Sequence, residues 1–265
     1  MRYKFSKENH IHSLDDKPLT GTSSIGNVLA KPLTWWASGK AVEVLGWTNP
    51  KKVIEQERLY IAGERFDEIR ELTIKEYMDL LDKAYRAHFD SLKTSAEKGT
   101  DLHAELERFV KSKMGKNKEN DFDDRIKPFI AWSDKNVKEF IASEAHCYSE
   151  RLWIGGITDA VARLSDDKLA VIDFKSSREA YITQFIQACL YAIQINENGL
   201  FSEDGEHNLK LDQPIEKIVV IPFGADKMPS NKELMRNVSV FIEGAESAVK
   251  LYRLMGLDEQ IKENK

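Results

Sequence analysis

The chain has 265 residues, of which 42% are hydrophobic and 31% charged, and its formal net charge is −5. Such a composition is typical of a globular protein with a substantial buried core. No run of about 18 apolar residues is present, so a membrane partner is not expected, and the acidic balance argues mildly against nucleic acid. The two cysteines are too few for a disulfide framework, and "MRYKFSKENH" lacks the apolar core of an export signal, so we expect an intracellular protein.

The first 94 residues predict a helical N-terminal region that packs on the remainder of the chain. We expect residues 1–20 to be irregular, short helices to begin at Ser23 and within "LTWWASGKAVEVLG", and a longer helix to begin after Thr73 as its N-cap. Thr94 and Glu97 have the spacing of a capping box, which predicts that a separate helix begins there and ends near Gly115.

Residues 95–265 are predicted to form the core domain. A helix over 125–142 precedes three segments that alternate and turn as strands do, "AHCYSE", "GGITDAVARL" and "KLAVIDFKS". A helix over 179–196, a strand over 215–223 and a helix over 231–256 follow. This order predicts an α/β fold in which helices flank a central mixed β-sheet.

Charged side chains end the most apolar of these strands. Asp173 and Lys175 are two residues apart in "LAVIDFKSS" and therefore share one face of the strand. Asp159 lies in the preceding strand, and the loop between the two strands decides whether it joins them. If residues 165–167 form a three-residue loop, Asp159 lies opposite Asp173 on the same face, whereas a two-residue loop would place it on the other face.

Two adjacent carboxylates repel each other unless a proton or a cation lies between them. Their hard oxygen ligands suit Mg²⁺ or Mn²⁺. A lysine beside such an ion can hold or deprotonate a water, while the ion stabilises charge on a phosphate oxygen. The three residues therefore favour metal-dependent phosphodiester hydrolysis. The alternative is an ordinary ion pair between Asp173 and Lys175 at the end of a strand.

Two helix motifs accompany these three residues. The segment "GTDLHAELE" places His103 and Glu107 on one helix face, and "QFIQACLYA" places Gln187 and Tyr191 on one face of the helix after the lysine strand. Each pair alone is equally compatible with the half-buried edge of an amphipathic helix.

Together the motifs resemble the RecB-like exonuclease branch of the PD-(D/E)XK nuclease superfamily, in its phage and mitochondrial type without an iron–sulfur cluster. That branch has G-x-x-x-H, G-x-x-D, D/E-x-K and Q-x-x-x-Y in this order. The chain has Gly99–His103, Gly156–Asp159, Asp173–Lys175 and Gln187–Tyr191. The resemblance covers roughly residues 95–195 and the strand and helix that close the core.

This resemblance implies a role for each motif residue. The implied metal ligands are His103, Asp159, Asp173 and the backbone carbonyl of Phe174, with Glu144 as a candidate for a second metal and Glu150 as its rival. Lys175 would position or activate the attacking water. Gln187 and Tyr191 would orient the catalytic site, and Tyr191 would also contact DNA. An iron–sulfur cluster, which many relatives hold with four cysteines, is not expected because only Cys147 and Cys189 are present.

These roles predict a Mg²⁺- or Mn²⁺-dependent DNA exonuclease of replication, recombination or repair, in the cytoplasm of a bacterium or a phage-infected host. The alternatives are a structure-specific or restriction-type endonuclease and a non-catalytic DNA-binding module on a nuclease fold. Four lysines after His103 would grip the DNA backbone, unless their loop is simply solvated; they are Lys111, Lys113, Lys116 and Lys118.

Overall fold

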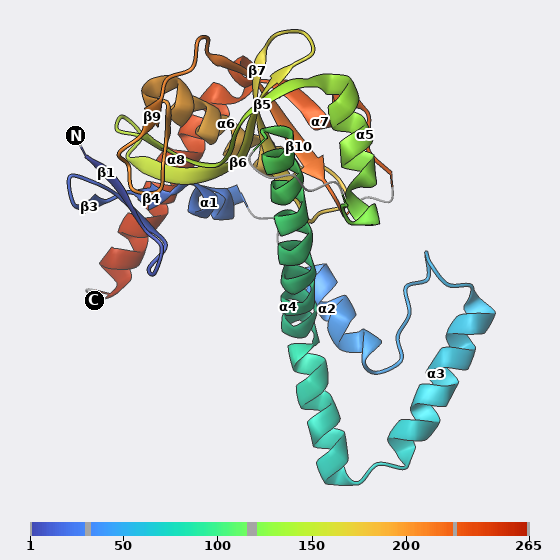
Figure 1. Cartoon of the computed structure of the whole chain (residues 1–265). Coiled ribbons are helices and arrows are strands. Elements are labelled where there is room, and N and C mark those ends of the chain that lie inside the picture. Colours follow the sequence, from blue (N-terminus) through green and yellow to red (C-terminus); the bar gives the residue numbers. More distant parts are fainter. Residues whose placement is uncertain (1, 30–32, 116–120, 225–226, 264–265) are drawn as a thin grey trace. The chain divides into compact units, whose positions relative to one another are not determined.

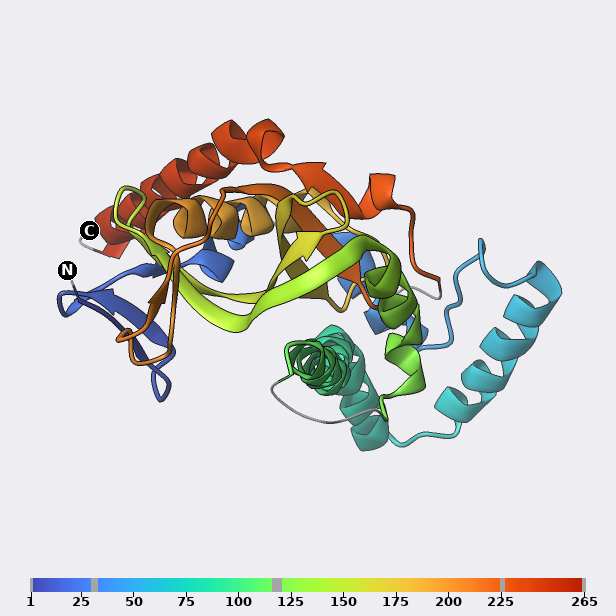
Figure 2. The same cartoon turned by 45° about the horizontal axis from the view of Figure 1, so that its top comes forward.

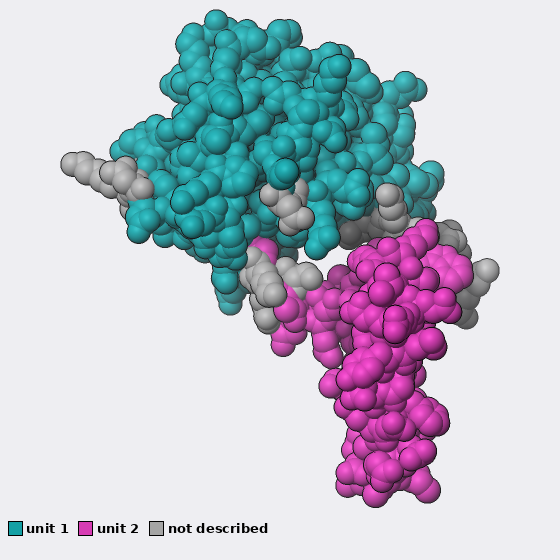
Figure 3. All heavy atoms as spheres, turned by 90° about the vertical axis from the view of Figure 1, so that its right-hand side faces the viewer, with its two compact units in different colours: residues 1–30, 100–265 teal, residues 31–99 magenta. Residues whose placement is uncertain are grey.

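The computed structural model describes residues 2–29, 33–115, 121–224 and 227–263 (Figure 1). The chain divides into two compact units, residues 1–30 with 100–265 and residues 31–99, which Figure 3 colours separately. The first thirty residues thus belong to the unit that holds the sheet, whereas the predicted boundary grouped them with the helical region. In the described ranges, no helix combines the length and apolar character needed to cross a membrane.

The larger unit is built on an eight-stranded mixed sheet. Its strands are β4 (Thr20–Gly21), β5 (Val137–Ser149), β6 (Ile154–Leu164), β7 (Leu169–Lys175), β8 (Leu200–Phe201), β9 (Asn208–Leu209), β10 (Ile215–Pro222) and β11 (Met235–Asn237). The spatial order is β11-β10-β7-β6-β5-β8-β9, with β4 beside β6. Strands β5, β6 and β7 are antiparallel neighbours, and β10 runs parallel to β7. The predicted α/β fold with a central mixed sheet is confirmed.

Helices cover both faces of this sheet (Figure 2). One face packs on α6 (Ile182–Asn198) and α8 (Val238–Glu263), the other on α5 (Lys127–Asn136) and the last turns of α4 (Ile74–Lys113). The strand β7 is buried on both sides, with Val171 in the first cluster and Ile172 and Phe174 in the second. This explains its nearly continuous apolar sequence.

The N-terminal residues form strands, so the expectation that residues 1–20 are irregular is wrong. They form β1 (Tyr3–Ser6), β2 (Ile11–Leu14) and β3 (Lys17–Pro18), and the short helices α1 (Thr22–Ile25) and η1 (Gly26–Leu29) follow. Alternating residues bury one face of this small sheet, because Tyr3, Leu14 and Leu19 pack in one cluster with Tyr148 of β5.

Three helical predictions are corrected by the sheet and its neighbours. The helix predicted over 125–142 comprises η2 (Asp124–Ile126) and α5 and ends at Asn136, because Val137 begins β5, in which Phe140 and Ala142 are buried. The final helix is interrupted after α7 (Asn231–Leu234), because β11 pairs with the otherwise open edge of β10. The separate helix predicted to begin at Thr94 is part of the continuous helix α4, in which no proline interrupts the backbone hydrogen bonds.

The smaller unit, residues 31–99, is helical. It contains α2 (Thr34–Glu43), α3 (Glu55–Arg70) and the first part of α4. The backbone N–H of Glu76 donates to the Thr73 hydroxyl across 3.4 Å, which confirms Thr73 as the N-cap of α4. The sequence did not reveal α3, because its apolar residues form no clear stripe.

Candidate metal and catalytic centre

The hairpin between β6 and β7 has the three-residue loop that the sequence predicted. Leu164 N–H donates to the Lys168 carbonyl across 2.9 Å, and Ala160 pairs with Ile172. This register places Asp159 opposite Asp173 and confirms the predicted arrangement. Asp167, the last loop residue, has a φ of 63°, which is typical of the third position in such hairpin loops.

Asp159 and Asp173 lie where the ladder between β6 and β7 stops. Asp159 Oδ2 accepts a 2.6 Å hydrogen bond from the Phe174 backbone N–H, so the carboxylate replaces a strand partner. Lys175 Nζ lies 2.8 Å from Asp173 Oδ1, to which it donates, and 2.7 Å from Oδ2. The Asp173 side chain is only 1% exposed, and its Oδ2 is among the few described buried oxygens without a hydrogen-bond partner of suitable geometry. A buried carboxylate is stabilised by an adjacent cation, and for Asp173 this cation is the Lys175 ammonium.

A third acid continues the row across β5. Ser143 pairs with Ala160 and Ala145 with Thr158, so Glu144 occupies the position opposite Asp159. Glu144 has a φ of 50° within a 13-residue strand. A non-glycine residue in the left-handed region is strained, and such strain concentrates at functional sites.

His103 reaches this row from α4. Its Nε2 lies 3.4 Å from Glu144 Oε1 and 3.5 Å from Asp159 Oδ1. One ligand atom each from His103, Glu144 and Asp159 lies within 4.8 Å of the others. A single ion at ordinary metal–ligand distances of about 2.0–2.6 Å can be shared by atoms so spaced.

Burial and mutual repulsion control the charges here. Burial, with the charge of Asp173, raises the pKa of Asp159 to about 7, and burial also raises the pKa of Asp173. The hydrogen bond with Glu144 raises the pKa of His103. Burial opposes the charge of Lys175, but the two aspartates outweigh it and raise its pKa. The cluster therefore favours added positive charge, and its carboxylate oxygens are ligands that Mg²⁺ and Mn²⁺ prefer.

The grouping of ligand atoms differs from the implied set. The structure brings together His103, Asp159 and Glu144, whereas the Asp173 carboxylate lies outside this group and faces Lys175. Phe174 presents its N–H to the site through Asp159. Glu150 is exposed in the turn after β5, so Glu144 is the acid of this segment that lies at the site.

The last motif forms a wall behind the carboxylates. Gln187 Nε2 donates to Tyr191 Oη across 2.9 Å, and Tyr191 is only 5% exposed. A Cβ on Gly156 would lie 2.6 Å from Tyr191 Cε1, so the ring fills the space that glycine leaves. Tyr191, Asp159 and Glu144 line one cavity of about 480 Å³.

The two described lysines of the predicted DNA-gripping set form ion pairs within the protein. Lys111 pairs with Glu107 on α4, and Lys113 lies 2.9 Å from Asp134. Lys116 and Lys118 lie outside the described residues. The β1–β2 hairpin, whose residues border the site, was not predicted from the sequence. The alternation of Tyr3 and Phe5, then of His12 and Leu14, about the turn "KENH" was the available signal.

Comparisons with known proteins found neither a family model nor a curated protein that matches the chain.

Proposed function

We propose that this protein is a divalent-metal-dependent deoxyribonuclease that hydrolyses phosphodiester bonds at DNA ends. The observation that carries the proposal is the convergence of Asp159, Asp173 and Lys175 on one face of a hairpin, beside His103 and Glu144. Four motifs in the order of the RecB-like branch support it. The preference for ends rests on that resemblance, because the same residues also suit an endonuclease.

In this proposal, some residues of the site hold the metal ion and others take part in proton transfer. His103, Glu144 and Asp159 would hold Mg²⁺ or Mn²⁺, which when bound supplies stabilisation of charge on a phosphate oxygen and a more acidic water. Lys175, whose pKa is raised, remains an ammonium that donates hydrogen bonds to the attacking water or to the phosphate. Asp173 holds this ammonium through both carboxylate oxygens, and burial raises the pKa of Asp173, so this carboxylate can also accept a proton.

The test compares Lys175→Ala with a matched lysine variant. Lys138, on β5, forms an exposed ion pair with Asp167, and Lys138→Ala serves as the control. We expect the wild type and Lys138→Ala to degrade end-labelled linear DNA with Mg²⁺ and to stop when EDTA is added. Lys175→Ala should lose about 10²–10⁴-fold in rate, which is the usual effect of removing a positioned acid–base group.

Digestion of circular and linear DNA, each single- and double-stranded, distinguishes the candidate functions. Degradation confined to linear DNA supports the exonuclease. Cleavage of closed circles would replace it with an endonuclease. DNA binding without cleavage by the wild type, or full activity in Lys175→Ala, would refute the catalytic proposal.

A further inference from the structure

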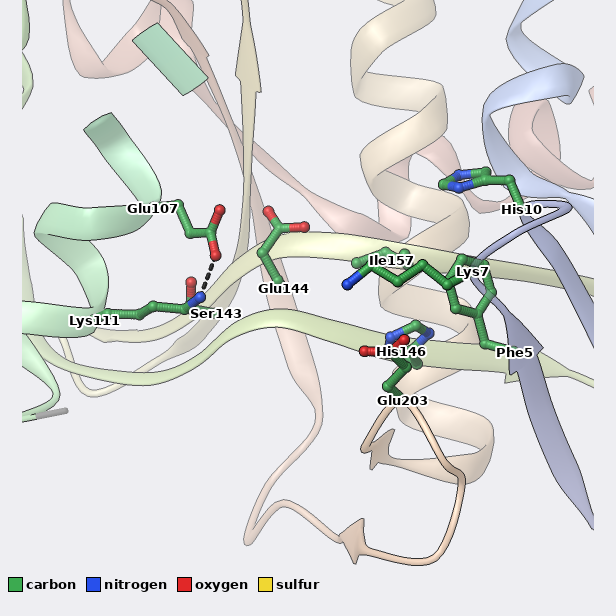
Figure 4. Close-up of a pocket in the computed structure, with 10 residues that line it drawn as sticks. All are labelled: Phe5, Lys7, His10, Glu107, Lys111, Ser143, Glu144, His146, Ile157 and Glu203. Carbon is green, nitrogen blue, oxygen red and sulfur yellow. Dashed lines mark hydrogen bonds and ion pairs between the residues drawn. The ribbon is translucent and has the colours of Figure 1, made fainter. Parts of the chain in front are cut away.

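A second cavity adjoins the candidate centre at Glu144. It has a volume of about 430 Å³ and is lined from four parts of the larger unit: the β1–β2 hairpin, the strands β5 and β6, α4, and the loop between β8 and β9 that carries Glu203 (Figure 4). It shares Glu144, His10 and Ile157 with the cavity that Tyr191 lines. The two cavities therefore meet at the acid that contacts His103.

Lys7 is the cation of this cavity for which the described residues supply no counter-ion. Figure 4 shows its side chain extending from the hairpin past Ile157 in the direction of Glu144. Lys111, on the opposite wall, pairs with Glu107. Among the described residues no ion pair involves Lys7, although Lys4 on the same hairpin lies 2.8 Å from Asp16. A free ammonium beside a phosphodiesterase centre is suited to a substrate phosphate.

Phe5 gives the cavity a fixed aromatic wall. Its ring is half-buried, with its centroid 4.7 Å from that of His12 and 4.8 Å from that of His146. His10 meets Phe5 edge-on at 5.2 Å and is exposed in the turn between β1 and β2, where its φ is 53°. Bases of single-stranded nucleic acids stack on such aromatic side chains whatever their identity.

The size and charge of the cavity limit which class of ligand it can bind. Its volume lies at the small end of the range for small-molecule sites, which is about 300–1,000 Å³, and suits one nucleotide rather than a base pair. The lining acids Glu107, Glu144 and Glu203 outnumber the lysines, so a phosphate would be repelled. A divalent cation held by Glu144 reverses this balance.

We propose that this cavity is a binding subsite for one nucleotide of a single DNA strand, adjacent to the bond that is cut. Phe5 and His10 stack the base, Lys7 binds the phosphate, and occupancy requires the divalent cation at Glu144. This inference rests on the proposed nuclease function, and it assigns single-stranded DNA as the substrate class.

The test measures binding apart from cleavage. Fluorescence anisotropy would follow a labelled short oligothymidylate in Ca²⁺, with the wild type, Lys7→Gln, Phe5→Leu and Lys4→Gln as the matched control. We expect about tenfold weaker binding for Lys7→Gln and for Phe5→Leu, and no change for Lys4→Gln. EDTA should weaken wild-type binding at least as much, and a blunt duplex of equal length should bind less tightly. Because Lys7 is exposed, Lys7→Gln should fold, and thermal melting checks Phe5→Leu.

The possible outcomes separate this subsite from the nuclease itself. Wild-type affinity in Lys7→Gln and in folded Phe5→Leu would overturn the subsite, and so would duplex binding as tight as that of the single strand. If the wild type cleaves DNA in that case, the nuclease stands without the subsite. Binding that depends on Lys7 in a protein that cleaves no DNA would leave the subsite standing and the nuclease refuted.

Discussion

The sheet unit and the helical unit of residues 31–99 are stabilised in different ways. Ile172 and its neighbours in β7 are almost fully buried, whereas Phe66 and Tyr60 of α3 are 63% and 67% exposed. The helices rely on local interactions such as the Arg65–Glu68 pair at 2.5 Å. Interactions of this kind each contribute a few tenths of a kcal/mol, so isolated helices are marginal without packing.

This contrast explains where the candidate centre lies. Asp159 and Asp173 project from adjacent buried strands, and Glu144 from the third, so each carboxylate has a rigid base. Sites on such elements hold their geometry more closely than sites on loops. The helical unit offers no comparable buried framework among its described residues, and we place no catalytic group there.

The largest expected difference between the units comes from deleting one apolar side chain in each. Ile172→Ala leaves a cavity between the sheet and α4, and should lower the free energy of unfolding by about 2–5 kcal/mol. Phe66→Ala removes a mostly exposed ring and should change it by about 0.5 kcal/mol or less. Urea unfolding followed by circular dichroism measures both. An equally large loss in Phe66→Ala would show that this ring is covered in solution.

The same contrast limits what the sequence could predict. The β6–β7 register followed from the loop length and the alternation of buried residues, so the pairing of Asp159 with Asp173 was foreseeable. The position of Glu144 at the site was less foreseeable, because it depends on contact with His103, which lies 41 residues earlier in the chain. The contribution of Phe5 and His10 was hidden for the same reason, since their hairpin packs against β5 rather than against nearby residues.

Replacing a glycine by alanine should change the stability in opposite directions in the two units. Gly156→Ala forces its Cβ against Tyr191 and Thr22, with contacts of 2.6 and 2.8 Å, and overpacking of this kind destabilises by about 1–3 kcal/mol. Gly63 lies inside α3, and a Cβ added there would meet no neighbouring atom within 4 Å. Gly63→Ala should therefore stabilise its helix by about 0.5–1 kcal/mol.

Amide hydrogen exchange tests the two glycine variants separately, because it reports stability element by element. Gly156→Ala should accelerate exchange of amides in β6, and Gly63→Ala should slow exchange of amides in α3. Unchanged protection of β6 in a folded Gly156→Ala protein would mean that the Tyr191 ring moves freely, contrary to the packing described above.

The smallest expected effect is a loss of folding stability in acid, and it should come from the sheet unit. Burial, with the charges of His146 and His10, lowers the pKa of His12 from 6.5 to about 3. His12 Nδ1 lies 2.6 Å from the buried Tyr3 hydroxyl. The folded state thus keeps His12 neutral, while the unfolded chain takes up a proton below pH 6.5. The stabilisation is present above pH 6.5 and is lost as the pH falls toward 3.

Between pH 6.5 and 5.5 this loss should amount to about 1 kcal/mol. Asp159 acts in the opposite direction, because its raised pKa lets the folded state hold an extra proton in this window. In the helical unit, hydrogen bonds from Thr73 lower the pKa of Glu76 below 4.5, so Glu76 does not titrate there. Comparison of wild type with His12→Gln by urea unfolding at both pH values isolates the histidine, because Asp159 is common to both proteins. The variant should lose about 1 kcal/mol less than the wild type between the two values, and an identical pH dependence would show that His12 is not buried as a neutral ring.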